Sequence, residues 1–561
     1  MINNTSKFIL QEEADKSYTK DKQKNLNIKF NRIAFIFFIF FLISTIYFIH
    51  LFYLGSRSLQ TINSKNYTSF EKIQRANITD RNGTFLAKTV NSIDIGINPL
   101  DVINKEKLLI NLKYIFPYKD YDLIRLRLEK NKFFWFEKKI SDENYEKIMM
   151  LGDKAIQPHE NLRRVYPQKN LFSHIIGQID DDNFGISGLE KSLDTVLKKN
   201  INSVKLTVDK DIQFLIREEL IKFNKVFNTI GSAAVLMDIH NGEIISIISL
   251  PDFDPNKRES IVDVNYINRA TKGIYELGSV FKTFTVAAAL NEGIISPETK
   301  FKNLEKSIKC GKNTISEYDK KIPENLTAEE ILIRSGNIGS VRIGQAVGIE
   351  KFKKFLNDLN LLEAIKFDIE EIGQPIQFNW GKCKLATTSY GHGITTTILQ
   401  LANAYAILGN GGFKIDPTLI KKDSNLKKEK ILNQNISKNL VQILRKIVTT
   451  KEGTASLANV SGYEVTGKTG TAQKIKDGVY SKKKINTFAS IFPASNPKYS
   501  LVVMLDEPKT NSNYIYHYRD GSGIKYKGTP FNTAGWTTVE VAGQIIEKIG
   551  PILATKYIQI Y

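Results

Sequence analysis

One apolar run near the N-terminus, residues 33–54, constrains the fold of this chain more than any other segment. At a rise of about 1.5 Å per residue, a helix of this length spans about 33 Å, enough to cross a hydrocarbon core of about 30 Å. The run is too long for the apolar part of a cleaved signal peptide, and no small-residue cleavage site follows it. We therefore predict a single transmembrane helix over residues 33–54.

The residues on either side of this run predict its orientation. Residues 1–32 are polar and rich in lysine, and basic flanks stay in the cytoplasm, so we expect a short cytoplasmic tail there. No second apolar run of that length follows, which places residue 55 onward outside the cytoplasm and argues against a nucleic-acid partner. The formal net charge of +20 does not change this view. Lysine is spread along the chain with abundant Asn and Ile, as biased codon usage would produce.

The rest of the chain is long enough for at least two folded domains. The whole chain has 561 residues and a hydrophobic content of 42%, which is ample for sizeable cores. Between residues 55 and 205, short apolar runs alternate with charged clusters and with turn signals such as Asn82-Gly83. No nucleophile in this part has a base beside it. We interpret residues 55–205 as an elongated, non-catalytic module.

Residues 206–561 have the pattern of an α+β domain. The apolar runs 233–238 and 243–250 are joined through His240-Asn241-Gly242, which predicts a hairpin. A second pair of apolar runs, 487–492 and 501–506, flanks another turn signal, and residues 464–473 form a further strand candidate. Near the C-terminus, apolar residues recur at helical spacing and predict a helix that covers one face of the sheet: Val539, Ala542, Ile545, Ile546 and Ile549.

This pattern predicts a mainly antiparallel sheet with helices on its faces. A helical insert between Pro255 and Ile447 would carry the first two of the candidate site elements described next.

The candidate nucleophile is Ser279, three residues before Lys282 in Gly278-Ser279-Val280-Phe281-Lys282. On a helix the two side chains share a face, so the Lys amine can take the Ser proton. A base of this kind needs a pKa about three units below the reference value of about 10.4, which corresponds to about 4 kcal/mol. The pattern S-x-x-K alone is unspecific, because it recurs at Ser17, Ser69, Ser424, Ser481, Ser495 and Ser522.

Other features distinguish Ser279 from those six serines. Gly278 permits a close backbone approach, and an apolar helical segment follows the pair and ends before Gly293. Two more elements complete a known constellation, namely Ser335-Gly336-Asn337 and Lys468-Thr469-Gly470. Lys468 is the candidate second cation beside Lys282, and burial together with that charge would lower the pKa of Lys282.

With these elements in order, the chain resembles a class B penicillin-binding protein, a membrane-anchored peptidoglycan DD-transpeptidase. The R-x-x-I-x-D-R-x-G box at residues 75–83 and the R-x-Y-P box at residues 164–167 resemble the non-catalytic pedestal of that family. The sequences G-S-V-F-K at 278–282 and S-G-N-I-G at 335–339 are closer to the septal, cell-division type than to the elongation type. The chain stops soon after its last predicted helix, as in Gram-negative members.

The resemblance implies a mechanism and partners. Ser279 would attack the carbonyl between the terminal D-alanines of a stem peptide, and Ser335 would relay protons to the leaving amine. Thr469 and Thr471, beside Gly470, would bind the terminal carboxylate, and Asn337 would hold the peptide backbone. The backbone N–H groups of Ser279 and Thr471 would form the oxyanion hole. Beta-lactams, a membrane glycosyltransferase and division proteins are the other implied partners, with no cofactor and no metal.

Several positions leave questions open. Leu277 and Gly336 stand where relatives often have Pro and Ser, which affects the expected loop geometry but no reacting group. His392, in a Gly-flanked loop, could border the cleft, although no Ser-His-Asp grouping accompanies it. Cys310 and Cys383 lack C-x-x-C spacing, so a metal site is not expected, whereas an oxidising compartment permits a disulfide between them.

Two other classes of function compete with the transpeptidase. A beta-lactamase would need a device that brings water onto the acyl-enzyme, and no Glu-x-x-Leu-Asn box of the class A type follows Ser335. A catalytically idle sensor or division scaffold would use the pocket for binding alone. The presence of all three boxes argues against that alternative.

Overall fold

The computed structural model describes residues 23–58, 75–199, 202–257, 263–311, 313–421, 429–476 and 479–556. The chain forms two compact units, Met1–Lys72 and Ile73–Tyr561. The first unit contains helix α2 (Gln23–Ser58), whose stretch Phe35–Phe52 is long and apolar enough to cross a membrane and is not buried against protein. This stretch lies within the predicted transmembrane segment, and it fits a single-pass membrane anchor. Residues 1–22 of the predicted tail lie outside the described residues.

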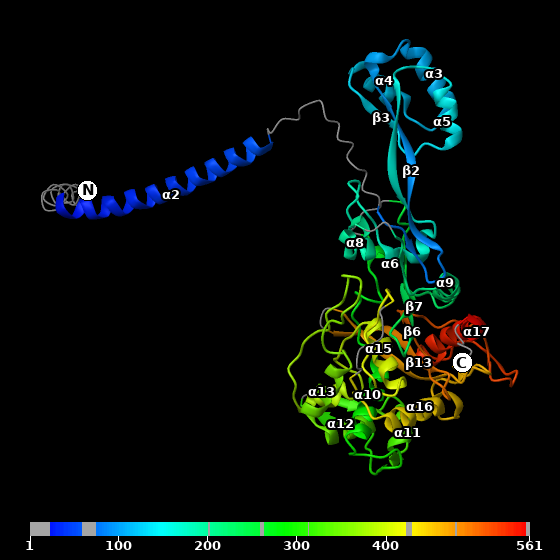
Figure 1. Cartoon of the computed structure of the whole chain (residues 1–561). Helices are drawn as coiled ribbons and strands as arrows, with labels where there is room; N and C mark the ends of the chain where they lie inside the picture. The colour runs from blue at the N-terminus through cyan, green and yellow to red at the C-terminus, as the bar shows by residue number, and fades with distance from the viewer. Residues whose placement is uncertain are drawn as a thin grey trace, which may run out of the picture. The chain divides into compact units, whose positions relative to one another are not determined.

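The second unit begins with a mixed sheet built around the long strand β2 (Phe85–Ile97). Strand β2 pairs antiparallel with β1 (Ile78–Thr79), β3 (Phe134–Glu137) and β4 (Ile156–Val165), and β1 pairs in parallel with β5 (Val204–Lys205). Around the β3 end of β2 lie three helices with a hydrophobic core of their own (Figure 1). These helices are α3 (Lys105–Ile115), α4 (Tyr121–Glu129) and α5 (Asp142–Met149).

Buried charges hold the other end of this sheet together. Glu190 lies in the short helix α7 (Gly188–Ser192), and its carboxylate accepts hydrogen bonds from Arg75 Nε at 3.0 Å and from Arg164 Nε at 2.7 Å. Arg75 also donates to Asp194 Oδ1 at 2.6 Å, at the start of helix α8 (Asp194–Lys199). The two arginine boxes of the sequence therefore meet in one ion-paired cluster, which supports their predicted structural use. The short helix α6 (Ser173–Ile176) precedes α7.

The second sheet is fully antiparallel, with the strand order β12-β13-β14-β6-β7. Its strands are β6 (Gly231–Asp238), β7 (Ile244–Leu250), β12 (Thr466–Lys476), β13 (Val479–Phe492) and β14 (Tyr499–Asp506). Both predicted hairpins are confirmed. In the first, Asp238 N donates to Glu243 O at 2.9 Å, and Gly242 adopts a φ of +79° that favours glycine in the turn.

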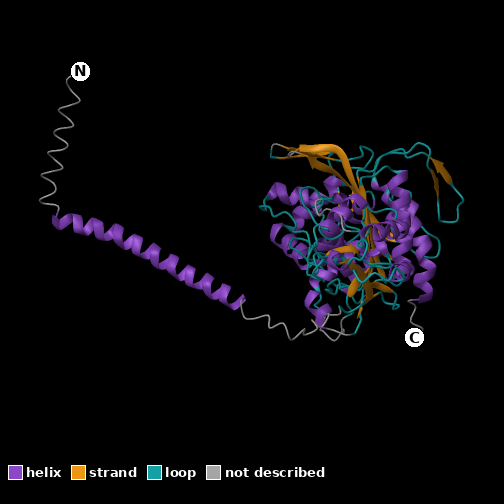
Figure 2. Cartoon of the chain, turned by 90° about the horizontal axis from the view of Figure 1, so that it is seen from above, coloured by secondary structure: helices purple, strands orange, loops and turns teal. Residues whose placement is uncertain are grey.

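Helices lie on both sides of this sheet (Figure 2). Helix α9 (Lys210–Val226), capped by Asp209, packs against α17 (Thr538–Lys556) and β7. Helix α15 (Ile398–Gly409) packs against β14, where Ser500 Oγ donates to Ala402 O at 3.1 Å. The predicted sheet-covering residues of α17 are all fully buried: Val539, Ala542, Ile545, Ile546 and Ile549.

The predicted helical insert is present between β7 and β12. Its helices, besides α15, are α10 (Lys282–Asn291), α11 (Ala328–Ile333), α12 (Asn337–Val347), α13 (Ile349–Asp358), α14 (Lys382–Thr388) and α16 (Gln434–Thr449). Small hairpins accompany them, formed by β8 (Lys300–Phe301) with β11 (Leu326–Thr327) and by β9 (Ser307–Cys310) with β10 (Asn313–Ser316). A further hairpin, β15 (Ile515–His517) with β16 (Lys525–Lys527), precedes α17. The predicted multidomain α+β fold is confirmed.

A disulfide joins Cys310 to Cys383, with 5.4 Å between their Cα atoms. It ties the β9–β10 hairpin to helix α14. The sequence left this bond open, because its spacing could not show whether the two cysteines meet.

Candidate functional site

Ser279 lies where three backbone segments meet. It is in the single 3-10 turn Gly278–Phe281 that leads into α10, so the regular helix begins at Lys282 and not at the serine. Gly278 has a φ of +65°, and a Cβ there would lie 2.7 Å from Thr471 O on β12. A Cβ at Gly391 would lie 1.9 Å from Gly278 O, and one at Gly470 would lie 2.1 Å from Leu277 O. The predicted close approach at Gly278 is confirmed.

Ser335 lies in the turn between α11 and α12, and Asn337 is the first residue of α12. Ser335 has a φ of +59°, in the left-handed region that is strained for a residue with a side chain. Glu317 supports this turn, because its carboxylate accepts from Asn337 N at 2.7 Å and from Ile338 N at 2.8 Å at the start of α12. A Cβ at Gly336 would make only ordinary van der Waals contacts, so packing does not require a glycine at this position, where the sequence departs from the family pattern.

The amine of Lys282 is fully buried, and its hydrogen bonds go to the second element. Nζ donates to Ser335 O at 2.5 Å, to Asn337 Oδ1 at 2.7 Å and to Ser335 Oγ at 3.2 Å. Within the described part of the chain, no hydrogen bond joins it to Ser279 Oγ, so the predicted direct reach to the nucleophile is not realised as a bond. Burial lowers the pKa of Lys282 to about 7, against an opposing effect of the Glu317 carboxylate.

Lys468 approaches the same hydroxyl from strand β12. Its fully buried Nζ donates to Ser335 Oγ at 2.8 Å, so the Ser335 hydroxyl lies between the two amines. Burial holds the pKa of Lys468 well below its usual range, and the neighbouring Lys282 lowers it further. Two amines with lowered pKa values, joined by one hydroxyl, form a group that can accept and pass protons near pH 7.

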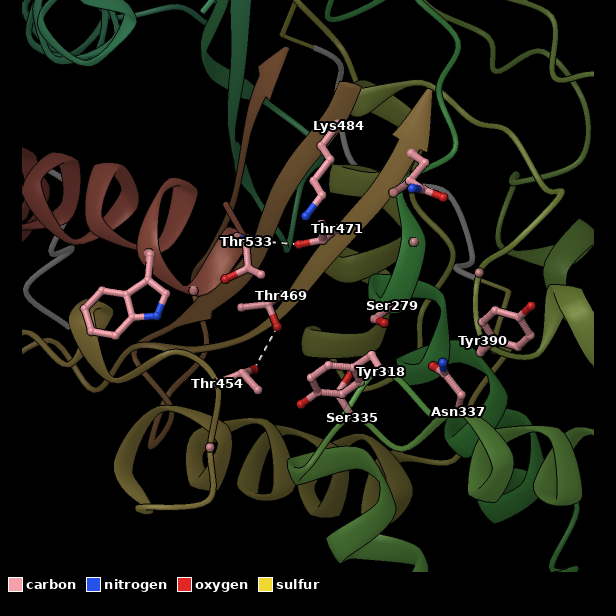
Figure 3. A pocket seen from close by; sticks show the side chains of 18 of the residues that line it. Ser279, Tyr318, Ser335, Asn337, Tyr390, Thr454, Thr469, Thr471, Lys484 and Thr533 are labelled. Carbon is pink, nitrogen blue, oxygen red and sulfur yellow. Dashed lines mark hydrogen bonds between the residues drawn. The ribbon is translucent and has the colours of Figure 1, made fainter. Parts of the chain in front are cut away.

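A cavity of about 610 Å³ opens over these groups (Figure 3). Five of the eight predicted site residues line it: Ser279, Ser335, Asn337, Thr469 and Thr471. The other three are buried next to it. Lys282 and Lys468 both donate to the hydroxyl of the cavity-lining Ser335, and Gly470 packs against Leu277 O. The structure therefore brings all three sequence elements together at one cavity.

The hydroxyls at the β12 edge of the cavity have specific partners. Thr469 Oγ1 and Thr454 Oγ1 are 2.7 Å apart, and Thr471 Oγ1 accepts from Ala534 N at 3.0 Å. The Thr471 hydroxyl thus has its own proton left to donate. Together, Thr469 and Thr471 present hydroxyls that fit an oxyanion or a carboxylate.

Several residues of this cavity were not identified from the sequence. Thr454, Tyr318, Lys484 and Trp536 line it, and Glu317 supports its Ser335 wall. They lie on segments far apart in the chain, and none belongs to a recognisable motif. No spacing in the sequence could have indicated them.

His392 does border the cavity, as its Gly-flanked loop allowed. Its ring stacks on Tyr390 and Tyr480, with centroid distances of 5.7 and 4.6 Å, and its Nδ1 is 3.8 Å from Glu276 Oε2. Burial lowers the pKa of His392, although the Glu276 carboxylate opposes this. The ring therefore helps to form the cavity wall.

Comparisons with known proteins agree with this architecture. Residues 232–521 match the penicillin binding protein transpeptidase domain, and residues 71–222 match the penicillin-binding protein dimerisation domain. The probable peptidoglycan D,D-transpeptidase FtsI of Caulobacter vibrioides is 30% identical over 86% of this chain and 82% of its own length. Stage V sporulation protein D of Bacillus subtilis is 31% identical over 78% of this chain and 74% of its own length.

A solved structure has a similar fold. Penicillin binding protein 3 of Mycobacterium tuberculosis, complexed with aztreonam, superposes with a TM-score of 0.64 at 24% identity, covering 85% of this chain and 96% of that chain.

Proposed function

Because the chain belongs to the penicillin-binding protein transpeptidase family, we propose that it is a membrane-anchored serine D,D-transpeptidase that cross-links peptidoglycan stem peptides. The observation that carries the proposal is the convergence of two buried amines on the Ser335 hydroxyl, in the wall of the cavity that Ser279 lines. This arrangement supplies a nucleophile, a base and a proton path at one place.

In the first half-reaction, Ser279 Oγ attacks the carbonyl between the terminal D-alanines. Its proton passes to Lys282, whose pKa of about 7 makes the amine mostly neutral above that pH, and the amine of the departing D-alanine takes a proton through Ser335. The C–N bond breaks and an ester remains on Ser279. In the second half-reaction, an acceptor amine attacks that ester, and Ser279 recovers its proton.

The proposed roles of the remaining groups follow from their positions. The backbone N–H groups of Ser279 and Thr471 form the oxyanion hole, which agrees with the close approach of Gly278 to the Thr471 backbone. Asn337 Nδ2 donates to Ser316 O at 2.8 Å, so its side chain is fixed at the cavity wall where it holds the substrate backbone. Thr469 and Thr471 bind the terminal carboxylate.

We place the N-terminal tail in the cytoplasm and the second unit outside it, on the basis of the basic residues in the tail 1–32 that precede the apolar run. A role in septal wall synthesis is supported by the FtsI relatives in Caulobacter vibrioides and Escherichia coli. Two other stages of wall synthesis are alternatives for this enzyme: sporulation, after the relative stage V sporulation protein D, and wall elongation. A membrane glycosyltransferase and other division proteins are the proposed partners, and residues 55–205 are the proposed pedestal.

Beta-lactam acylation tests the chemistry. The detergent-solubilised full chain, mixed with benzylpenicillin, should gain the intact mass of the drug on Ser279, and Ser279→Ala should lose the adduct while it keeps the wild-type thermal unfolding midpoint. A stable adduct supports the transpeptidase. Rapid loss of the adduct with turnover of the drug would instead indicate a beta-lactamase, and the lack of any adduct would indicate a non-catalytic scaffold.

A further inference from the structure

The cavity over Ser279 has a marked charge asymmetry. Among the described residues that line it, Lys484 is the one lysine or arginine, and no Asp or Glu is present. A cavity of this composition attracts anions rather than cations.

Lys484 is held in place at this cavity. It lies on β13 opposite Gln473 of β12, and its Nζ donates to Asn532 O at 2.8 Å. Asn532 is fixed in turn, since its amide donates to Pro508 O at 2.5 Å and accepts from Asn486 Nδ2 at 3.0 Å. Figure 3 shows the Lys484 amine pointing toward Thr471 and Thr533. An ammonium has three N–H donors, so this bond leaves others for a ligand.

The neighbouring lysines Lys474 and Lys483 have acidic partners, whereas Lys484 has none among the residues that the structure describes. Lys474 pairs with Asp506 and Glu507 at 2.8 and 2.9 Å, and Lys483 pairs with Glu507 at 2.8 Å. Within the described residues, no carboxylate lies within ion-pair distance of Lys484. Its charge is therefore available to whatever occupies the cavity.

The carboxylate proposed to bind Thr469 and Thr471 lacks a cationic partner among the three sequence elements. Lys468 is fully buried and bonded to Ser335, and its lowered pKa favours the neutral amine. The two threonines offer hydroxyls, which are neutral donors. A hydrogen bond to a charged partner is stronger than one between neutral groups, so an ammonium at this edge would add affinity for an anion.

We propose that Lys484 is a specificity-determining residue that recognises the terminal carboxylate of the donor peptide beside Thr471. The inference rests on the proposed function and deepens it. The site selects donors, and beta-lactams, that carry a free carboxylate over esters or amides of the same skeleton.

The test uses two probes that differ in this charge, benzylpenicillin and its methyl ester, with the full chain in detergent. Second-order acylation rate constants of Ser279 are measured by intact mass for the wild type, Lys484→Gln, Lys484→Arg and Lys483→Gln. We expect Lys484→Gln to lower the rate for the acid about tenfold and to leave the ester rate unchanged. Lys484→Arg should retain most of the acid rate. Lys483→Gln, the matched control at an exposed, paired lysine, should change neither rate.

Each other outcome decides against the proposal. Equal loss for acid and ester in Lys484→Gln would show a structural effect, and unchanged rates for both probes would show that Lys484 does not contact the carboxylate. Equal losses in Lys483→Gln and Lys484→Gln would show a general charge effect. A wild-type protein that neither probe acylates would overturn the proposed function itself, and this inference with it.

Discussion

Two fully buried clusters of ionisable residues in the described part of the chain differ in composition. In the first, Arg75 and Arg164 enclose Glu190, so opposite charges are in contact and every carboxylate oxygen has a donor. In the second, Lys282 and Lys468 converge on a neutral hydroxyl. Glu317 influences Lys282 through its charge, but its carboxylate bonds to the backbone of α12.

This difference separates structural from chemical use of a buried charge. In the first cluster, hydrogen-bonded opposite charges offset part of the cost of desolvation, and the cluster joins strands, a turn and a short helix. Two amines without a contacting acid cannot compensate in that way, and burial lowers their pKa values instead. The first cluster should therefore control stability, and the second should control reactivity.

The largest expected effect is loss of acylation in Lys282→Met. This variant removes the proposed base, so the rate constant for benzylpenicillin at pH 7.5 should fall by about 10³-fold or more. Lys282 forms no ion pair with any described residue, so the free energy of unfolding should change by less than about 2 kcal/mol. Intact-mass kinetics measure the first quantity, and the thermal unfolding midpoint follows the second. Acylation within tenfold of the wild type would mean that another group is the base.

Glu190→Gln should have the opposite effect, a loss of stability with acylation retained. It leaves two buried guanidinium groups without their carboxylate, and breaking a buried pair costs about 3–5 kcal/mol. Hydrogen exchange of peptides from residues 75–97 and 156–199, followed by mass spectrometry, reports this local loss. Benzylpenicillin should still acylate Ser279 at low temperature.

The matched control for Glu190→Gln is Glu106→Gln, which breaks an exposed pair with Arg125. It should cost less than about 1 kcal/mol. Similar losses in Glu106→Gln and Glu190→Gln would remove the distinction between the two clusters.

Much of the fold follows from local patterns in the sequence. The hairpin around Gly242 and the buried face of α17 depend on turn chemistry and helical spacing, which a short window of sequence contains. The three site elements were identifiable because each is a short motif on a predicted element. Arg75 and Arg164 lie in separate boxes of the sequence, but their contact with Glu190 depends on packing, and Glu190 is 115 residues from Arg75.

The parts that could not be predicted depend on long-range packing. The hydrogen bonds of Lys282 go to Ser335 rather than Ser279, because α11 and α12 bring the turn at Ser335 over the start of α10. Glu317 and Lys484 take part in the site through segments that carry no motif, and the Cys310–Cys383 disulfide joins residues 73 positions apart. Such contacts are set by tertiary structure.

The smallest expected effect tests the link between Glu317 and Lys282. Lys282 acts as a base when it is neutral, so the acylation rate should rise with pH around its pKa of about 7. The Glu317 carboxylate favours the charged amine and raises this pKa, so Glu317→Gln should lower it and move the profile to lower pH. At pH 6 the variant should then react faster than the wild type, by less than about tenfold, since one pKa unit changes the neutral fraction tenfold at most. Asp319→Asn, two residues away, is the matched control and should leave the profile in place. A shift to higher pH, or an equal shift in both variants, would show that the Glu317 charge does not act on Lys282.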